Sequence, residues 1–175
     1  MASFKNPWGK GNREFDKWFG INGTALEGSV IPIKRDISDG GNVNVGGFQS
    51  SFNIDKAVNW LDNNAKVVSQ HACAKYVRLA LEAGGINTNP HPVSAKDYGP
   101  FLQGWGFNTL SSTNYSPIKG DIRVFQPYPG GSQYGHIDMY NGNQWLSDFK
   151  EKNEFPGSGY RNSMYALFRW TDNNS

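Results

Sequence analysis

The spacing of apolar residues predicts a helix over residues 54–68, where the patterned part of the chain begins. Ile54, Val58 and Leu61 recur at intervals of four and three residues, so a helix would place them on one face. The polar stretch 62–64 is a point at which this helix can break. We therefore expect an amphipathic helix with one face turned toward a core.

A second helix is predicted to begin at Cys73. Val77, Ala80 and Leu81 follow Cys73 at offsets of four, seven and eight residues and therefore share a face with it. The glycine pair 84–85 stops this helix, because glycine favours the conformation in which helices end. The two helices would thus follow each other directly along the chain.

The pattern becomes strand-like in the second half of the chain. Three prolines make residues 87–100 a loop, and the aromatic stretch 98–107 can form a short helix that ends at Gly104. Alternating positions and turn residues then predict strands within 119–125, 135–140, 144–149 and 160–170. Helices followed by an antiparallel meander indicate an α+β fold with the N-terminal helices packed on one face of the C-terminal sheet.

Composition fits a single domain of 175 residues, with a core in residues 54–170 and an N-terminal extension, residues 1–50, that the pattern leaves unassigned. Apolar residues make up only 37% of the chain, but 14% aromatic residues argue against disorder. A net charge of +2 without a basic run gives no indication of nucleic-acid binding. Since no long apolar segment is present, we expect neither membrane contact nor a signal peptide. We also expect a monomer.

The chemistry of the chain centres on Cys73, which is its only cysteine and therefore a free thiol. A thiol in the first turn of a helix lies at the positive end of the helix dipole, where the thiolate is stabilised and becomes more reactive. The alternative is that Cys73 is a small buried apolar residue, as free cysteines often are.

A nucleophilic cysteine needs a base, and three histidines are available. His136 is favoured, because it follows a glycine at the start of a predicted strand and so has a rigid support. His91 lies between prolines in a loop, and His71 lies two residues before Cys73, where it could line the site. A zinc site made by Cys73, His71 and His136 would lack a fourth ligand, so we expect no metal and no cofactor.

The hairpin turn at Asn141–Gly142 selects the candidate that orients His136. A two-residue loop would place Ser147 opposite His136, whereas a three-residue loop would place Asp148 there. The two candidates exclude each other as direct neighbours, because a shift of one residue turns every side chain to the other face. Asp148 is favoured, because a carboxylate holds an imidazole and stabilises its charged form.

Candidate substrate contacts come from aromatic and polar residues near these elements. Tyr98, Trp105 and Tyr134 could wall a cleft, although aromatic residues of this kind also form cores. His71 and Ser147 complete the set of predicted contacts.

Four stretches in this order resemble the NlpC/P60 and CHAP superfamily of papain-like cell-wall peptidases and amidases: 71–77, 119–125, 135–142 and 145–149. The resemblance covers residues 54–170 and implies a papain-like fold, with Cys73 as nucleophile, His136 as base and Asp148 as the orienting residue. One departure is Ala72, since members of this superfamily often have an aspartate or glutamine before the cysteine.

The same resemblance implies hydrolysis of an amide bond in a peptidoglycan stem peptide or its cross-link. A wall-cleaving enzyme without a signal peptide is similar to phage lysins and to type VI secretion amidase effectors, which are neutralised at home by a cognate immunity protein. The effector is favoured, because the single domain carries no wall-binding module. Two alternatives stay open: a wall- or sugar-binding module without catalysis, and a papain-like hydrolase that acts on another substrate.

Overall fold

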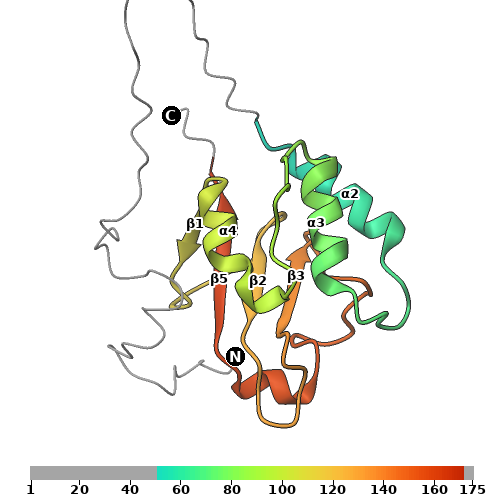
Figure 1. Ribbon diagram of the computed structural model, residues 1–175, viewed down its shortest axis with the longest axis vertical. Helices are drawn as coiled ribbons and strands as arrows, with labels where there is room; N and C mark the ends of the chain where they lie inside the picture. The colour runs from blue at the N-terminus through green and yellow to red at the C-terminus, as the bar shows by residue number, and fades with distance from the viewer. Residues whose placement is uncertain (1–50, 172–175) are drawn as a thin grey trace, which may run out of the picture.

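The computed structural model describes residues 51–171, in which helices pack against an antiparallel sheet (Figure 1). The helices are α2 (Ile54–Asn64), α3 (Cys73–Ala83) and α4 (Tyr98–Gly104), with the 3-10 turns η1 (Ala95–Asp97) and η2 (Ser158–Asn162). The strands are β1 (Phe107–Leu110), β2 (Ile122–Phe125), β3 (His136–Tyr140), β4 (Trp145–Leu146) and β5 (Tyr165–Trp170). This arrangement confirms the α+β class; the N-terminal extension lies outside the described residues.

Both long helices form where the apolar spacing predicted them. In α2 the side chain of Asn53 accepts a hydrogen bond from the Lys56 amide and caps the helix, which ends at Asn64 rather than at residue 68. Ala57, Val58 and Leu61 are its buried residues. In α3 the buried residues are Val77, Ala80 and Leu81, as predicted, and the helix ends at the glycine pair. The two helices pack against each other, and α3 also packs on β3.

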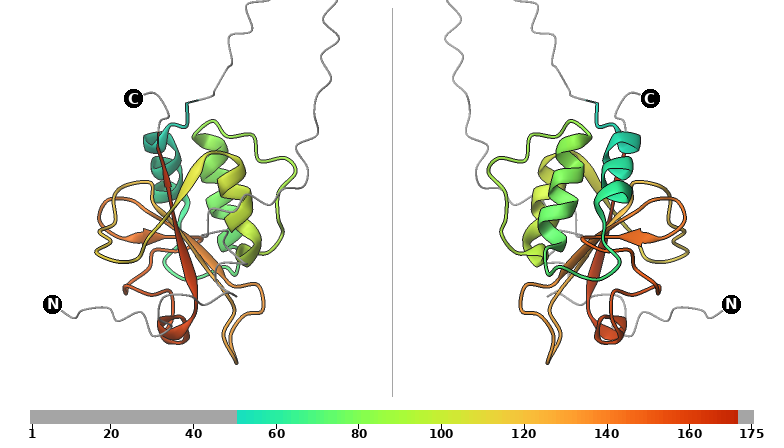
Figure 2. Two further views of the ribbon diagram at one scale, coloured as in Figure 1. Left: turned by 90° about the vertical axis from the view of Figure 1, so that its left-hand side faces the viewer. Right: turned by 90° about the vertical axis from the view of Figure 1, so that its right-hand side faces the viewer.

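The strands pair in the order β1-β5-β2-β3-β4, with every pairing antiparallel. The predicted meander is therefore correct only for β2, β3 and β4, because the last strand, β5, inserts between β1 and β2. Strand β1 was not predicted, since two polar residues separate its apolar ends and leave no alternating pattern. With the sheet seen edge-on, α3 and α4 lie on the same side of it (Figure 2).

Strands β2 and β3 divide their side chains between two faces of the sheet. One set joins the core beneath the helices: Ile122, Val124, Ile137 and Met139. The alternate set lies on the opposite face: Arg123, Phe125, His136 and Asp138. There the rings of Tyr160 and Phe149 lie 5.7 and 6.4 Å from the His136 ring, measured between centroids. His136 is therefore covered by segments that come late in the chain.

The hairpin between β3 and β4 differs from both predicted registers. Tyr140 pairs with Trp145, so four residues rather than two or three form the loop. The side chain of Asn141 accepts hydrogen bonds from the amides of Asn143 and Gln144, and these bonds stabilise the longer turn. Strand β4 ends after Leu146, and neither Ser147 nor Asp148 is paired opposite His136.

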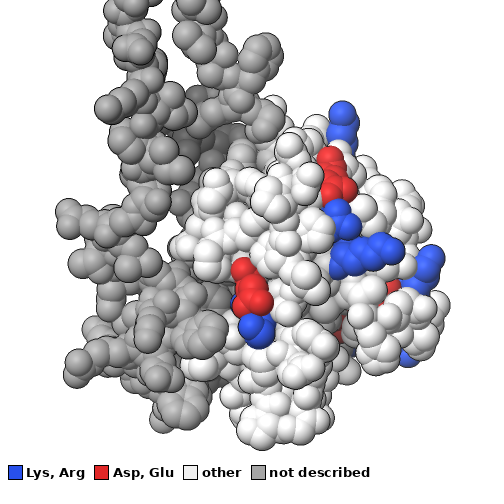
Figure 3. Space-filling view, in the orientation of Figure 1, with Lys and Arg blue, Asp and Glu red and all other residues white. Residues whose placement is uncertain are grey.

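Charged side chains are few on the face shown in Figure 3 and include both signs. Within residues 51–171, no helix has the length and apolar character needed to cross a membrane.

Candidate active site

The structure brings Cys73 and His136 together, although they lie far apart in the sequence. Cys73 is the first residue of α3 and His136 is the first residue of β3, and these two elements pack against each other. The Cys73 side chain lies close enough to the imidazole to raise the pKa of His136. The thiol is half-buried, whereas His136 is 7% exposed. A nucleophile at the start of a helix thus faces a base that a strand holds in place.

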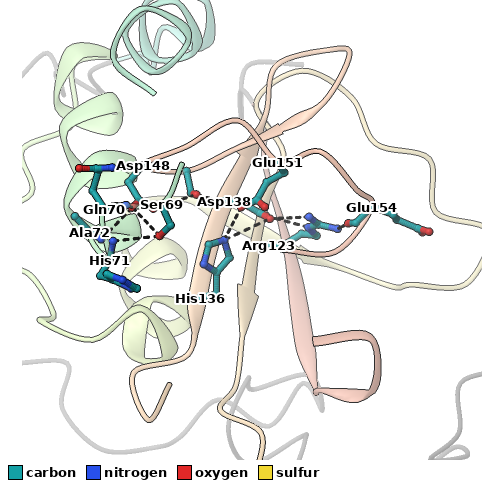
Figure 4. Close-up of polar contacts among 11 residues, drawn as sticks. Ser69, Gln70, His71, Ala72, Arg123, His136, Asp138, Asp148, Glu151 and Glu154 are labelled. Atoms are coloured by element: carbon teal, nitrogen blue, oxygen red, sulfur yellow. Dashed lines mark hydrogen bonds and ion pairs between the residues drawn. The ribbon is translucent and has the colours of Figure 1, made fainter. Parts of the chain in front are cut away.

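The second partner of the imidazole is Glu151. Its Oε1 lies 3.0 Å from His136 Nε2, in a position where the carboxylate is almost fully buried (Figure 4). Because Nε2 is engaged by Glu151, Nδ1 is the ring nitrogen left for the thiol. The order thiol, imidazole, carboxylate is the arrangement in which a base is activated and oriented by a third group.

These contacts decide the charge state of the imidazole. Burial lowers the pKa of His136, but hydrogen bonds to Cys73 and Glu151, together with the charges of Cys73 and Asp138, outweigh burial and raise this pKa to about 10. Burial also raises the pKa of Glu151, and the hydrogen bond to His136 opposes that rise. At neutral pH the geometry thus favours a charged imidazolium beside the sulfur.

Asp148 does not take the place beside His136 that the sequence predicted. Its Oδ2 instead accepts hydrogen bonds from the Ser69 hydroxyl and from the amides of Gln70 and Ala72 (Figure 4). The difference arises because the four-residue loop shifts the register, so that a longer β4 would bring Phe149 rather than Asp148 opposite His136, and because β4 ends at Leu146. After Leu146 the chain turns back through an isolated bridge to Lys150, and this turn delivers Glu151 to the ring.

Sequence reasoning missed Glu151, because it stands between Lys150 and Lys152 and looks like part of an exposed charged run. The predicted substrate contact Ser147 lies four residues before Glu151 in the sequence. Ser147 is fully buried, and its hydroxyl lies 3.1 Å from Glu151 Oε1 and 3.2 Å from Asp148 Oδ1. Ser147 therefore contacts the two carboxylates rather than a substrate.

The other predicted substrate contacts are distributed differently. Tyr98 is buried under α3, where its hydroxyl donates to the Ala74 carbonyl oxygen at 3.4 Å, so it belongs to the core. Trp105 packs on Phe101 at the edge of the core. His71 and Tyr134 are exposed, and Trp105 is half-buried.

A hollow of about 260 Å³ opens next to Glu151. Its lining comes from two segments, the stretch before α3 and the stretch after β4: Val67, Val68, Ser69, Phe149, Glu151, Lys152, Asn153, Phe155 and Pro156. Val67 and Val68 are 75% and 64% exposed, which is unusual for adjacent valines. None of the aromatic residues predicted as walls lines this hollow.

A buried ion pair lies behind the imidazole. Arg123 donates from Nε and Nη2 to the two oxygens of Asp138, at 2.9 and 2.6 Å, and from Nη1 to the Glu154 carbonyl oxygen at 2.7 Å. The guanidinium also stacks 3.7 Å above the centre of the Trp145 ring. Arg123 thereby neutralises Asp138 and holds the segment that carries Glu151.

The described residues include one group with donor atoms suited to a metal: His136, Asp138 and Glu151, whose ligand atoms lie within 4.8 Å of one another. Both oxygens of Asp138 already accept hydrogen bonds from Arg123. The Arg123 guanidinium therefore already supplies a positive charge beside these carboxylates. The three side chains fit the arrangement in which a carboxylate orients a histidine. His71, the other histidine considered for zinc, is not in the group.

Comparison with known proteins finds similar chains among solved structures. The sequence matches no protein-family model and no curated protein. The crystal structure of the native type VI effector–immunity complex Tae3–Tai3 from Ralstonia pickettii contains a chain that is 41% identical, with a TM-score of 0.63; the match covers 69% of this chain and 100% of that one. A selenomethionine form of the same complex matches at 42% identity and a TM-score of 0.58, over 64% of this chain and 97% of that one.

Proposed function

Because this chain belongs to the Tae3 family of type VI effectors, we propose that it is an antibacterial effector that hydrolyses an amide bond of peptidoglycan, with Cys73 as nucleophile. The observation that carries this proposal is the chain of contacts from Cys73 through His136 to Glu151 at the N-terminus of α3. The matched structures name Tae3 rather than NlpC/P60 or CHAP, so the papain-like fold and the stem-peptide substrate remain predictions from resemblance.

The proposed reaction is acyl transfer in two steps. The Cys73 thiolate attacks the amide carbonyl carbon, the C–N bond breaks, and the leaving amine takes a proton from the His136 imidazolium. Water then attacks the thioester and gives a proton to the neutral imidazole, which releases the carboxylic acid and restores the thiolate. The hydrogen bond that the His136 Nε2–H donates to Glu151 keeps the ring oriented through both proton transfers.

The start of α3 offers a donor for the oxygen that becomes negative during attack. Cys73 is the first residue of the helix, and amides in the first turn have no acceptor within the helix. Its N–H is therefore available to the developing oxyanion, in the region where the helix dipole favours negative charge.

A substitution of Glu151 tests the order of the contacts. In Glu151→Gln the carboxylate that favours the imidazolium is lost, so we expect the pKa of His136 to fall and the alkaline limb of the kcat/KM profile to move to lower pH. We expect kcat to fall about 100-fold, the lower end of the range of about 10² to 10⁴ that a positioned acid–base group contributes. The measurement is the pH profile of peptidoglycan digestion.

The matched control is Glu154→Gln, because Glu154 meets Arg123 through its backbone carbonyl rather than its side chain. This variant should keep the wild-type profile. An alkaline limb that stays in place in Glu151→Gln would assign the orienting role to another group.

The decisive test of the function is digestion of purified peptidoglycan followed by mass analysis of the fragments. We expect new pairs of amine and carboxylic acid ends with the glycan chains intact, and the masses identify the amide. Sacculi that bind the protein but stay uncut would favour a wall-binding module, which is the second candidate that the exposed valines beside the hollow support. Neither cleavage nor binding would point to a substrate other than the wall.

The matched complexes pair an effector with an immunity protein, so we extend the proposal to a cognate immunity protein for this chain. Action in the cell wall of a target cell after secretion follows from the same proposal.

A further inference from the structure

Asp148 holds the segment that leads into the nucleophile helix. One of its oxygens, Oδ2, accepts from the Ser69 hydroxyl at 3.1 Å, from the Ala72 amide at 3.2 Å and from the Gln70 amide. The Asp148 side chain is 1% exposed, so water does not compete for these donors. Ala72 is the residue before Cys73, which means that Asp148 holds the chain one residue away from the sulfur.

Apart from this carboxylate, the hydrogen bonds of residues 69–72 are local: the His71 amide donates to the Ser69 hydroxyl, and the Gln70 side-chain amide donates to the Val68 carbonyl oxygen. The N-cap residue of α3 is Ala72, which offers no side-chain hydrogen bond, and the first turn contains no acidic residue. His71 adopts a φ of 57°, in the left-handed region that a non-glycine residue enters only when its surroundings hold it there. Asp148 therefore does for this turn what a local cap does for other helices.

Backbone pairing joins the same two segments a second time. The Lys66 amide donates to the Asp148 carbonyl oxygen at 2.8 Å, and the Lys150 amide donates to the Lys66 carbonyl oxygen at 3.0 Å. The stretch after β4 is thus attached to the stretch between α2 and α3 through both backbone and side chain.

This stretch also carries the residue that orients the base. We call residues 147–151 the bridging segment. Glu151 at its end contacts His136, and the Ser147 hydroxyl at its start lies within hydrogen-bonding distance of both Asp148 and Glu151. Because the serine has one proton to donate, it donates to one of the two carboxylates at a time.

From this arrangement we infer that Asp148 is a positioning residue for the nucleophile. The bridging segment fixes residues 69–72 with Asp148 and the imidazole with Glu151, and so determines where the Cys73 sulfur lies relative to His136. The inference rests on the proposed function, since it names a further residue of the same site. The sequence predicted that Asp148 orients His136. The inferred role is different, because Asp148 holds the segment before Cys73 rather than the base.

Two substitutions separate position from charge. Asp148→Glu keeps the charge and adds one methylene group, which displaces residues 69–72. Asp148→Asn removes the charge but keeps the length, and its carbonyl oxygen can still accept from the same donors. A positioning role therefore predicts that the charge-conserving variant is the more damaged one, whereas an electrostatic role predicts the reverse.

The first readout is the rate of iodoacetamide labelling at pH 6, which needs no substrate and reports on a single thiol. We expect labelling to slow about tenfold in Asp148→Glu and to stay within about threefold of wild type in Asp148→Asn. The second readout is peptidoglycan digestion, in which Asp148→Glu should lower kcat about 10- to 100-fold with little change in KM, because the reacting groups are misplaced while the substrate still binds.

The matched control is Asp121→Glu. Asp121 is equally buried and accepts from the Ile118 amide, the Tyr115 hydroxyl and Arg169, but it precedes β2 at the end of the strand away from His136. The same substitution there should leave Cys73 labelling unchanged. If Asp148→Glu does not fold, Ser69→Ala replaces it: loss of this one donor should slow labelling two- to fivefold, and an unchanged rate would overturn the inference.

The outcomes also separate this inference from the proposed function. Equal or greater damage in Asp148→Asn than in Asp148→Glu, or no damage in Asp148→Glu, would overturn the positioning role even if peptidoglycan is cleaved. The expected order of labelling rates in a protein that leaves peptidoglycan intact would support the positioning role and reject the substrate.

Discussion

Replacing Cys73 by alanine should abolish peptidoglycan digestion while the protein stays folded. We expect a loss of at least about 10⁴-fold in kcat, because Cys73 is the proposed nucleophile and removal of a nucleophile leaves only binding and oxyanion contacts. Alanine is well tolerated at the first position of a helix, and Cys73 is only half-buried, so the melting temperature should change by no more than a few degrees. Digestion and thermal unfolding of the same preparation check both parts.

The single cysteine makes the control for this experiment simple. Iodoacetamide should add one mass increment to the wild type and none to Cys73→Ala. In His136→Gln, which keeps the cysteine, labelling at pH 6 should slow, because the thiolate loses its imidazolium partner. Cleavage that persists in Cys73→Ala would remove the cysteine from the mechanism and leave the His136–Glu151 pair to be explained as a general base acting on water.

Replacing Arg123 by methionine should cause the largest loss of stability. Arg123 and Asp138 form a pair in which the side chains are 4% and 0% exposed, so removal of the arginine leaves a buried carboxylate that has lost both guanidinium hydrogen bonds and keeps only the His136 imidazole, 3.9 Å away, as a cation. Such a loss costs about 3–5 kcal/mol in the free energy of unfolding. Since the whole free energy of unfolding of a domain is about 5–15 kcal/mol, this variant should be close to unfolding at ambient temperature. Urea denaturation measures the difference.

A double variant distinguishes the lost countercharge from lost packing. Arg123→Met combined with Asp138→Leu removes both charges and should recover most of the stability, because two apolar residues of similar volume can replace a buried pair. Arg169→Met serves as the matched single control: its pair with Asp121 is partly exposed at the arginine, and Asp121 retains the Ile118 amide and the Tyr115 hydroxyl as donors. An equal loss of unfolding free energy in Arg123→Met and Arg169→Met would contradict the expectation that the fully buried pair near His136 contributes more to stability.

The parts of the site that could be predicted are those fixed by regular structure. Cys73 was identified because apolar spacing placed it at a helix start, and His136 because a glycine and an alternating pattern placed it at a strand start. Each position follows from a local pattern within a few residues. That the two positions meet depends on the packing of α3 against β3, which the α+β order of elements made plausible but did not specify.

Glu151 could not be found in the same way. The turn at Asn141–Gly142 is a signal for a two-residue hairpin, but the hydrogen bonds that the Asn141 side chain accepts from two backbone amides stabilise a four-residue loop instead. Strand β4 then ends after two residues, and the chain reverses before it reaches the level of His136. Reasoning from register assumes that the strand continues, and here it does not. Asp148 was selected for the correct chemical reason, a carboxylate near the site, but for the wrong partner.

The brevity of β4 also bears on how the protein behaves in concentrated solution. As the last strand of the sheet order, β4 forms one rim of the sheet, but it spans two residues, and Leu146 is already bridged to Lys150 on its outer side. A rim of this kind leaves little unpaired backbone for a strand of another molecule to join. The turn that delivers Glu151 to His136 thus also shields this rim of the sheet from edge-to-edge aggregation.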